Sequence, residues 1–230
     1  MMRKKVIIIL IIIIISFTLG YLTIYIKNKN IISEGAKFKI EYESLNNVKD
    51  DKSNNEYLNI NIDSNNDVKY ASIDKILDIL NGKNNETAII YFGKSDCPWC
   101  RNMIVTLLQV AKENDIKKIY YYNPEEIRKE NTEQYQELVS FLKDYLRTDT
   151  TTQKETDQNF DSSKKRLYMP DVYFIKNGKI IGNHICTVDS QTNPKIELTD
   201  TQKQELKEIY NNFIKQMKST STCDEGKGPC

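Results

Sequence analysis

The chain has 230 residues, of which 33 are Lys or Arg and 32 are Asp or Glu, so its formal net charge at pH 7 is +1. This length suits one domain with additional segments, because domains usually contain about 100 to 200 residues. Since the charges nearly cancel, the chain lacks the overall basic field that gathers nucleic-acid phosphates, and we expect no nucleic-acid partner.

The first distinctive segment is an uncharged, largely apolar run from Val6 to Ile26, which follows a basic cluster at Arg3 to Lys5. Roughly 20 such residues span about 30 Å of hydrocarbon as a helix, so we expect residues 1–27 to form a single-pass anchor in the cell membrane. A cleaved signal peptide is the alternative, with Thr18 and Gly20 as small residues near the cleavage site. The basic cluster favours a short cytoplasmic tail and an extracytoplasmic C-terminal domain.

Residues 28–67 are polar and rich in asparagine, with two short stretches in which apolar and polar residues alternate, 38–42 and 57–62. This composition indicates a polar spacer between the anchor and the main domain. The alternation in the second stretch also predicts an edge strand where the spacer ends.

A helix and a strand open the main domain, which we expect over residues 68–218. Ser72 is a suitable N-cap, apolar residues recur after it at helical spacing, and Gly82 is a suitable stop. Residues 87–92 are apolar and rich in β-branched or aromatic side chains, which predicts a buried strand. The motif Cys97-Pro98-Trp99-Cys100 follows and precedes another helical pattern, so both cysteines should lie where a helix begins after a strand.

The middle of the domain contains an enlargement. A second strand is expected over residues 118–122, and Asn123-Pro124-Glu125-Glu126 has the cap, the proline and the acidic first turn of a helix start. We therefore expect a helical insertion over residues 124–147, followed by a long polar loop over residues 148–166.

A β-hairpin follows the loop. The dipeptide Asn177-Gly178 separates strands expected over residues 171–175 and 179–185, and it is a strong indicator of a two-residue turn. Two parallel strands joined through a helix, followed by an antiparallel hairpin, predict an α/β fold with a mixed central sheet flanked by helices.

A final helix and a tail complete the chain. Thr199 and Gln202 match a capping box ahead of an amphipathic helix. Residues 219–230 are polar, contain two cysteines, and are expected to be a flexible tail.

The Cys97-Pro98-Trp99-Cys100 motif is the main candidate for an active site. Unpaired backbone N–H groups and the positive dipole end at a helix N-terminus stabilise a thiolate, so Cys97 is expected to be the nucleophile. The two-residue spacing turns Cys100 toward Cys97 within one helical turn. Cys100 can therefore resolve a mixed disulfide that forms at Cys97.

Charged neighbours and a metal alternative bear on this interpretation. Asp96 opposes thiolate formation while Lys94 and Arg101 oppose Asp96, so the sequence leaves the net pKa of the first cysteine open. A lone C-x-x-C motif could also be half of a zinc site or a redox-inactive structural disulfide. Zinc needs about four ligands, and the chain has one His and five Cys without a second close pair. Redox chemistry is favoured, with no metal and no bound cofactor.

These motifs resemble the thioredoxin superfamily over roughly residues 73–217. The matching residues are Ala88-Ile89-Ile90-Tyr91-Phe92-Gly93, then Cys97-Pro98-Trp99-Cys100-Arg101, then Met169-Pro170 ahead of the hairpin. More narrowly, the anchor, the Tyr-Phe-Gly strand end and the Cys-Pro-x-Cys-Arg site resemble membrane-anchored thioredoxin-like proteins of Gram-positive bacteria, including bacteriocin transport accessory proteins.

The resemblance implies roles for further residues. Pro170 would be a cis-proline opposite the dithiol that holds client backbone in strand-like pairing, with Met169 and Trp99 contacting the client beside it. Met169 departs from the Thr, Val or Ile usual before this proline, which leaves redox potential and client choice open. Tyr91 stands where thioredoxins carry a buried acid, and a phenol with a reference pKa of about 10 would not deprotonate Cys100 near neutral pH.

The combined expectation is a membrane-tethered thiol–disulfide oxidoreductase that exchanges disulfides with cysteines of exported proteins. A separate redox partner protein is compatible with this function, and the direction of exchange stays open. The alternative from another class is a redox-inactive accessory module that uses the same fold to hold a partner polypeptide at the membrane.

The tail cysteines Cys223 and Cys230 are separated by residues that let the chain turn back, so their thiols can pair. A disulfide closing so short a loop adds little stability. Our hypothesis is a second, exposed dithiol that exchanges electrons with the Cys97–Cys100 pair. A tail disulfide or two free thiols without a role is the competing interpretation, and a bond between Cys186 and one tail cysteine is a third.

Overall fold

The computed structural model describes residues 14–20, 32–51 and 55–219. The chain divides into two units, residues 1–33 and residues 34–230, and each is described by itself. In the first unit residues 14–20 are helical. None of the helices in the described ranges has both the length and the apolar character needed to cross a membrane. Most of the anchor expected over Val6 to Ile26 lies outside the described residues.

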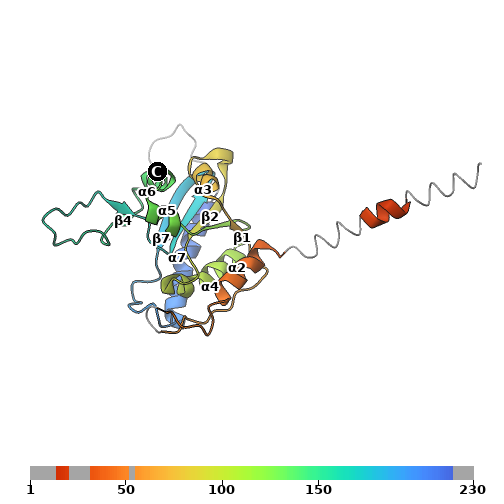
Figure 1. Cartoon of the computed structure of the whole chain (residues 1–230), viewed down its shortest axis with the longest axis horizontal. Coiled ribbons are helices and arrows are strands. Elements are labelled where there is room, and N and C mark those ends of the chain that lie inside the picture. The colour runs from red at the N-terminus through yellow and green to blue at the C-terminus, as the bar shows by residue number, and fades with distance from the viewer. Residues whose placement is uncertain (1–13, 21–31, 52–54, 220–230) are drawn as a thin grey trace, which may run out of the picture. The chain divides into compact units, whose positions relative to one another are not determined.

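A five-stranded mixed sheet in the order β1-β3-β2-β6-β7 forms the centre of the second unit (Figure 1). β1 and β2 run parallel to β3, whereas β6 is antiparallel to both β2 and β7. The strands span Val68–Tyr70 (β1), Ala88–Phe92 (β2), Ile119–Tyr122 (β3), Asp171–Lys176 (β6) and Lys179–Ile185 (β7). The predicted α/β fold with a mixed central sheet is confirmed.

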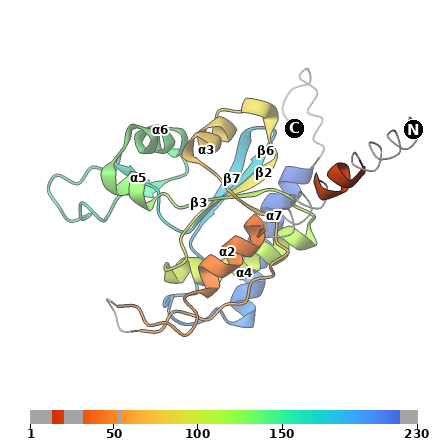
Figure 2. The same ribbon diagram turned by 45° about the vertical axis from the view of Figure 1, so that its right-hand side comes forward.

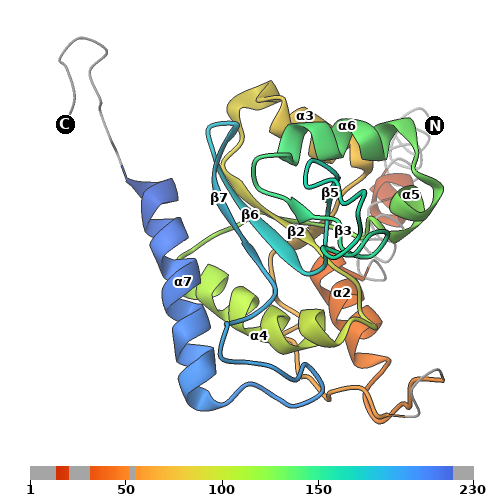
Figure 3. The same cartoon turned by 90° about the vertical axis from the view of Figure 1, so that its left-hand side faces the viewer.

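Helices cover both faces of this sheet, as Figure 3 shows. α2, α4 and α7 pack on one face, and α3 and α6 pack on the other. Their bounds are Glu34–Glu43 (α2), Ile73–Leu80 (α3), Pro98–Glu113 (α4), Glu133–Leu142 (α6) and Asp200–Lys218 (α7), and a 3-10 turn, Lys83–Asn85, follows α3. The first face buries Cys97 and Cys100 in its hydrophobic cluster, so the dithiol belongs to the core formed by α2, α4 and α7.

Local sequence determines where several elements begin and end. The Ser72 hydroxyl accepts a backbone hydrogen bond at the start of α3, and Thr199 forms the expected capping box with Gln202 at the start of α7. Asn177 and Gly178 have φ values of 49° and 73°, the left-handed conformation that a tight hairpin between β6 and β7 requires. These predictions from the sequence are confirmed.

The expectation of a spacer over residues 28–67 is wrong for the described part of that range. Glu34–Glu43 is helix α2, and its Phe38 and Tyr42 are fully buried. These two side chains are four residues apart and therefore lie on one face of a helix. A five-residue window is too short to separate that spacing from strand alternation. Figure 2 shows α2 beside α4, so this segment is part of the domain.

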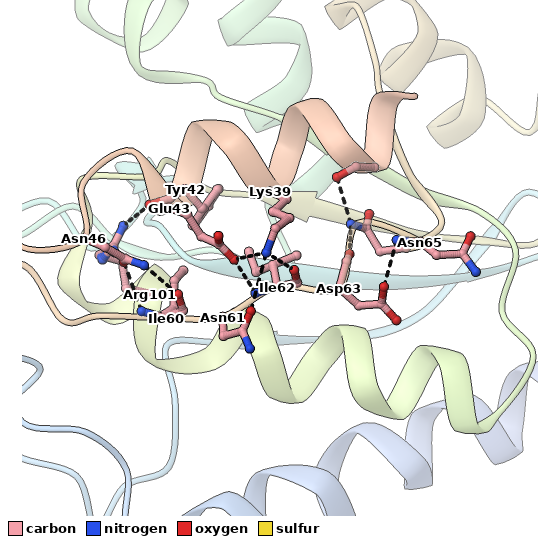
Figure 4. A network of polar contacts seen from close by, with 12 residues as sticks. Lys39, Tyr42, Glu43, Asn46, Ile60, Asn61, Ile62, Asp63, Asn65 and Arg101 are labelled. Carbon is pink, nitrogen blue, oxygen red and sulfur yellow. Dashed lines mark hydrogen bonds and ion pairs between the residues drawn. The ribbon is translucent and has the colours of Figure 1, made fainter. Parts of the chain in front are cut away.

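The edge strand expected in the same region is also absent from the described sheet, and an extended segment held by side chains stands in its place (Figure 4). Asn46 donates to the Ile60 carbonyl at 2.8 Å and accepts from the Ile60 N–H at 3.1 Å. Glu43 accepts from the Ile62 N–H at 2.6 Å, and Lys39 donates to the Ile62 carbonyl at 2.7 Å. Side chains thus satisfy the backbone groups that a neighbouring strand would otherwise pair.

The helical insertion expected over residues 124–147 consists of two short helices, α5 (Glu125–Glu130) and α6. The break lies at Asn131, which has a φ of 50°. Thr132 then caps α6 by accepting a hydrogen bond from the Tyr135 N–H at 3.2 Å. The insertion is therefore helical but not one continuous helix, because Asn131 adopts the left-handed conformation that asparagine tolerates.

The loop expected over residues 148–166 is closed at its base by a two-stranded antiparallel sheet. β4 (Arg147–Thr148) pairs with β5 (Lys165–Arg166), and the segment between them extends away from the central sheet in Figure 1. This pairing holds the two ends of the loop together.

Candidate active site

Cys97 lies where the turn after β2 leads into α4, as the motif predicts. It is the N-cap of α4, and its Sγ accepts a hydrogen bond from the Cys100 N–H at 3.4 Å. Pro98 stands in the first turn of the helix, where its missing N–H leaves no gap in the hydrogen bonding. Cys97 is 8% exposed and Cys100 is 0% exposed, so Cys97 is the thiol nearer to solvent.

The two thiols differ in acidity. Hydrogen bonding with Cys100 and with backbone N–H groups of the first helical turn lowers the pKa of Cys97, and the charge of Lys94 acts in the same direction. Burial raises the pKa of Cys100 well above its usual value. Lys94 also pairs with Asp96 at 3.2 Å and Glu125 at 2.8 Å, which offsets the acidic neighbour. Cys97 is therefore the thiol that ionises first.

Met169 and Pro170 face this dithiol, joined by a cis peptide bond. The Cys97 thiol donates to the Met169 carbonyl at 3.6 Å. The Pro170 carbonyl accepts a hydrogen bond from the Cys186 N–H at 2.9 Å, which ties the end of β7 to the same loop. The structure thus brings Cys97 together with Met169 and Pro170 from two separate parts of the chain.

A groove of ≈ 570 Å³ lies between Met169 and the 148–166 loop with its two-stranded base. Trp99 and Met169 line its dithiol side, and Arg147 and Lys165 line it from β4 and β5. Cys186 also lines the groove. β4, β5 and the loop between them therefore add surface next to Trp99, on which an extended polypeptide can lie.

Arg101 organises the other side of the site, and its role was missed from the sequence. It is 1% exposed, and its guanidinium donates to the carbonyls of Leu58 (2.8 Å), Tyr42 (2.7 Å) and Ser95 (3.0 Å) and to Asn46 Oδ1 (2.8 Å). Figure 4 shows its place beside Asn46. Its acceptors lie mainly in the region interpreted as a spacer, so no pattern near the motif identified them.

Tyr91 and Tyr42 form a buried pair behind the dithiol. Both are 0% exposed, and their hydroxyls are 2.8 Å apart. They share one hydrophobic cluster with Cys100. Burial raises the pKa of each phenol well above its usual value. Tyr91 was singled out from the sequence, whereas Tyr42 was missed because α2 was not predicted.

The remaining cysteines are separate from this pair. Cys186 follows β7 directly and, like Cys97 and Cys100, is a free thiol. Cys223 and Cys230 lie outside the described residues, so the second dithiol stays a prediction. Across residues 14–20, 32–51 and 55–219, no three His, Cys, Asp or Glu side chains gather as metal ligands would.

No protein-family model matches the chain, and no curated protein matches it either. Its function is therefore inferred from the geometry of the dithiol and its surroundings.

Proposed function

We propose that this chain is a thiol–disulfide oxidoreductase of thioredoxin-like fold, tethered to the membrane through Val6 to Ile26, which acts on cysteines of exported proteins. One observation carries the proposal: the acidified Cys97 thiol lies at the N-cap of α4, 3.6 Å from the Met169 carbonyl and beside the cis Pro170. This arrangement leaves one sulfur able to attack a client, while the buried Cys100 keeps its proton.

In the proposed cycle, the Cys97 thiolate attacks one sulfur of a client disulfide. A Cys97–client bond forms, the client disulfide breaks, and the departing client sulfur takes up a proton. Cys100 then loses its proton and attacks Cys97, which releases the second client thiol. The client gains two electrons and the dithiol becomes a disulfide. The reverse sequence oxidises client thiols, and a separate redox partner resets the pair without a bound cofactor.

The groove beside the dithiol supports an extended polypeptide as the client. Trp99 provides an aromatic surface, and Arg147 and Lys165 provide two positive charges against the single negative charge of Glu155. A client strand lying along Met169 would bring its cysteine to Cys97, since the Met169 carbonyl already contacts that thiol. Client segments with acidic residues near the cysteine should bind best.

The test compares the full chain with Cys97→Ser and Cys100→Ser variants on a peptide that contains one disulfide. We expect the unmodified chain to catalyse exchange, Cys97→Ser to lose it by at least a hundredfold, and Cys100→Ser to accumulate a mixed disulfide at Cys97, because nothing resolves it. Cys97→Ser/Cys100→Ser is the matched control for trapping. Equal rates for the unmodified chain and Cys97→Ser would indicate the redox-inactive binding module instead.

The tether has its own test. Protease added to intact, wall-stripped cells should digest the C-terminal domain, since the basic cluster at Arg3 to Lys5 favours a cytoplasmic N-terminus. Protection until the membrane is broken would contradict this orientation. Recovery of a soluble form that begins near Tyr21 would show cleavage in place of anchoring.

A further inference from the structure

We infer that Tyr91 is a further catalytic residue of the dithiol site, whose hydroxyl donates a hydrogen bond to the Cys100 sulfur when this sulfur is a thiolate, and that Tyr42 positions Tyr91. The inference rests on the proposed disulfide exchange and concerns its second step. Tyr91 of β2 and Tyr42 of α2 share one buried hydrophobic cluster with Cys97 and Cys100, and their hydroxyls meet inside it.

The position of the Tyr91 hydroxyl is tightly determined. It lies 2.8 Å from the Tyr42 hydroxyl in a fully buried cluster. Gly93 leaves room for it, because a Cβ at that residue would lie 2.2 Å from the Tyr91 hydroxyl oxygen. The ring also stacks on Tyr121, with centroids 5.6 Å apart. Hydrogen bonding with Tyr91 lowers the pKa of Cys100, against the larger effect of burial.

The ionisable groups that interact most strongly with Cys100 from the elements packed around it include four phenols and one thiol. They are Tyr42 of α2, Tyr91 of β2, Tyr121 of β3, Tyr210 of α7 and Cys97. Carboxylates contact these phenols in turn: Glu41 accepts a hydrogen bond from Tyr121 at 2.7 Å, and Asp171 interacts with Tyr210. The Cys100 sulfur therefore has phenol hydroxyls as its neighbours.

A phenol serves this step as a donor and not as a base. When Cys100 attacks the mixed disulfide, the Cys100–Cys97 bond forms, the Cys97–client bond breaks, and the Cys100 proton ends on the departing client sulfur. Negative charge resides briefly on Cys100, and the Tyr91 proton stabilises it without being transferred. The oxygen of Tyr91 can then accept from Tyr42. In the reverse direction, the same contact stabilises Cys100 as the leaving thiolate.

The experiment isolates the second step in the full chain. Cys186→Ser, Cys223→Ser and Cys230→Ser are introduced in every variant, so that only the dithiol reacts with a stoichiometric aromatic disulfide, 5,5′-dithiobis(2-nitrobenzoate). The first coloured thiolate is released when Cys97 attacks the reagent, and the second is released when Cys100 resolves the mixed disulfide. Each release is measured by stopped-flow absorbance as a function of pH.

We expect Tyr91→Phe to slow the second release about tenfold at neutral pH, which corresponds to about 1.4 kcal/mol in the barrier, and to move its pH midpoint up by about one unit. Tyr42→Phe should shift both in the same direction by a smaller amount, about threefold in rate. Tyr121→Phe is the matched control, because it removes a hydroxyl from a stacked ring that bonds Glu41 instead. The first release should be unchanged in all three.

An unchanged second release and pH midpoint in Tyr91→Phe would overturn the inference. If that variant does not fold, Tyr42→Phe with the same two measurements decides. The outcomes also separate the two proposals. If both releases are normal in the unmodified chain but peptide clients are not exchanged, the proposed function is contradicted. The effect of Tyr91→Phe on the second release still decides the role of Tyr91. A tyrosine effect equal on both releases would indicate general damage to the site and would likewise reject the inference.

Discussion

Among single residues, the three described cysteines have different reactivities for separate physical reasons. Cys97 is nearly buried but receives backbone N–H groups at a helix N-terminus, which lowers its pKa. Cys186 is more exposed than Cys97, yet its partial burial raises the pKa of its thiol. Acidity therefore favours reaction of Cys97 with an electrophile first, whereas exposure favours Cys186 first.

We expect iodoacetamide to modify Cys97 before Cys186 and Cys100 at neutral pH, because the thiolate is the reacting form. The rate at Cys97 should reach half its maximum below about pH 8.5, the value of an unperturbed thiol, and the rates at the other two should do so above it. Peptide mapping by mass spectrometry follows each site. Modification in the order of exposure, with Cys186 first, would contradict the assigned nucleophile.

Asp171 offers a second test at this scale. It is 0% exposed directly after Pro170, its Oδ2 has no hydrogen-bond partner, and burial raises its pKa to about 8. An acid whose folded pKa exceeds its unfolded value of about 3.9 binds more protons when folded, so the free energy of unfolding falls as pH rises through this window.

Asp171→Asn should remove this dependence while keeping the Oδ1 atom that accepts from Asn183 at 2.9 Å. Between pH 5 and pH 8, the variant should gain on the order of 3 kcal/mol relative to the unmodified chain. Urea unfolding at the two pH values measures it, with Asp144→Asn as an exposed carboxylate for comparison. A variant whose stability falls with pH as steeply as that of the unmodified chain would show that Asp171 titrates normally.

The elements around α4 are held together by hydrogen bonds from one buried cation. Arg101 joins α4 to the end of α2 and to the segment that follows it through three neutral oxygens, and a fourth bond goes to the Ser95 carbonyl in the turn before α4. Lys112 also joins α4 to that segment, through an ion pair with Asp63 at 2.7 Å. The side chains of Lys112 and Asp63 are both more than half exposed. The two contacts link similar elements in very different surroundings.

Arg101→Met should lower the free energy of unfolding by about 3 kcal/mol, because buried carbonyls lose their donors. Lys112→Met should cause little change, since solvent screens an exposed ion pair. Chemical denaturation of the full chain measures both, and limited proteolysis reports whether the segment before β1 detaches. Equal losses in the two variants would mean that burial of Arg101 does not decide its contribution.

For the whole molecule, the boundary of the folded unit lies well before the predicted one. Residues 34–230 form one unit, and the main hydrophobic cluster includes Phe38, Tyr42, Ile60 and Ile62 from the region before β1. Each such side chain contributes roughly 1.5–3 kcal/mol when buried. Together they rival the total stability of an ordinary domain, about 5–15 kcal/mol.

A protein of residues 34–230 should unfold cooperatively on heating, whereas residues 68–230 alone should not, because the shorter chain lacks this part of the core. Near-ultraviolet circular dichroism during a thermal scan distinguishes the two. A sharp transition in the shorter chain would restore the interpretation of the preceding region as a spacer.

The sequence by itself determined the features that depend on neighbours in the chain. Helix caps at Ser72 and Thr199, the turn at Asn177-Gly178 and the placement of Cys97 at a helix start are local, because each rests on contacts a few residues apart. The order of these elements was also sufficient for the mixed α/β sheet.

Only the tertiary structure decided what surrounds the dithiol. α2 is weakly patterned, and its two buried aromatic residues acquire meaning only against the sheet. Arg101 looks like a surface charge until segments about 43 to 59 residues away supply its acceptors. The Tyr42–Tyr91 pair joins positions 49 residues apart. Such contacts depend on how the chain packs in three dimensions, and no local spacing or propensity records them.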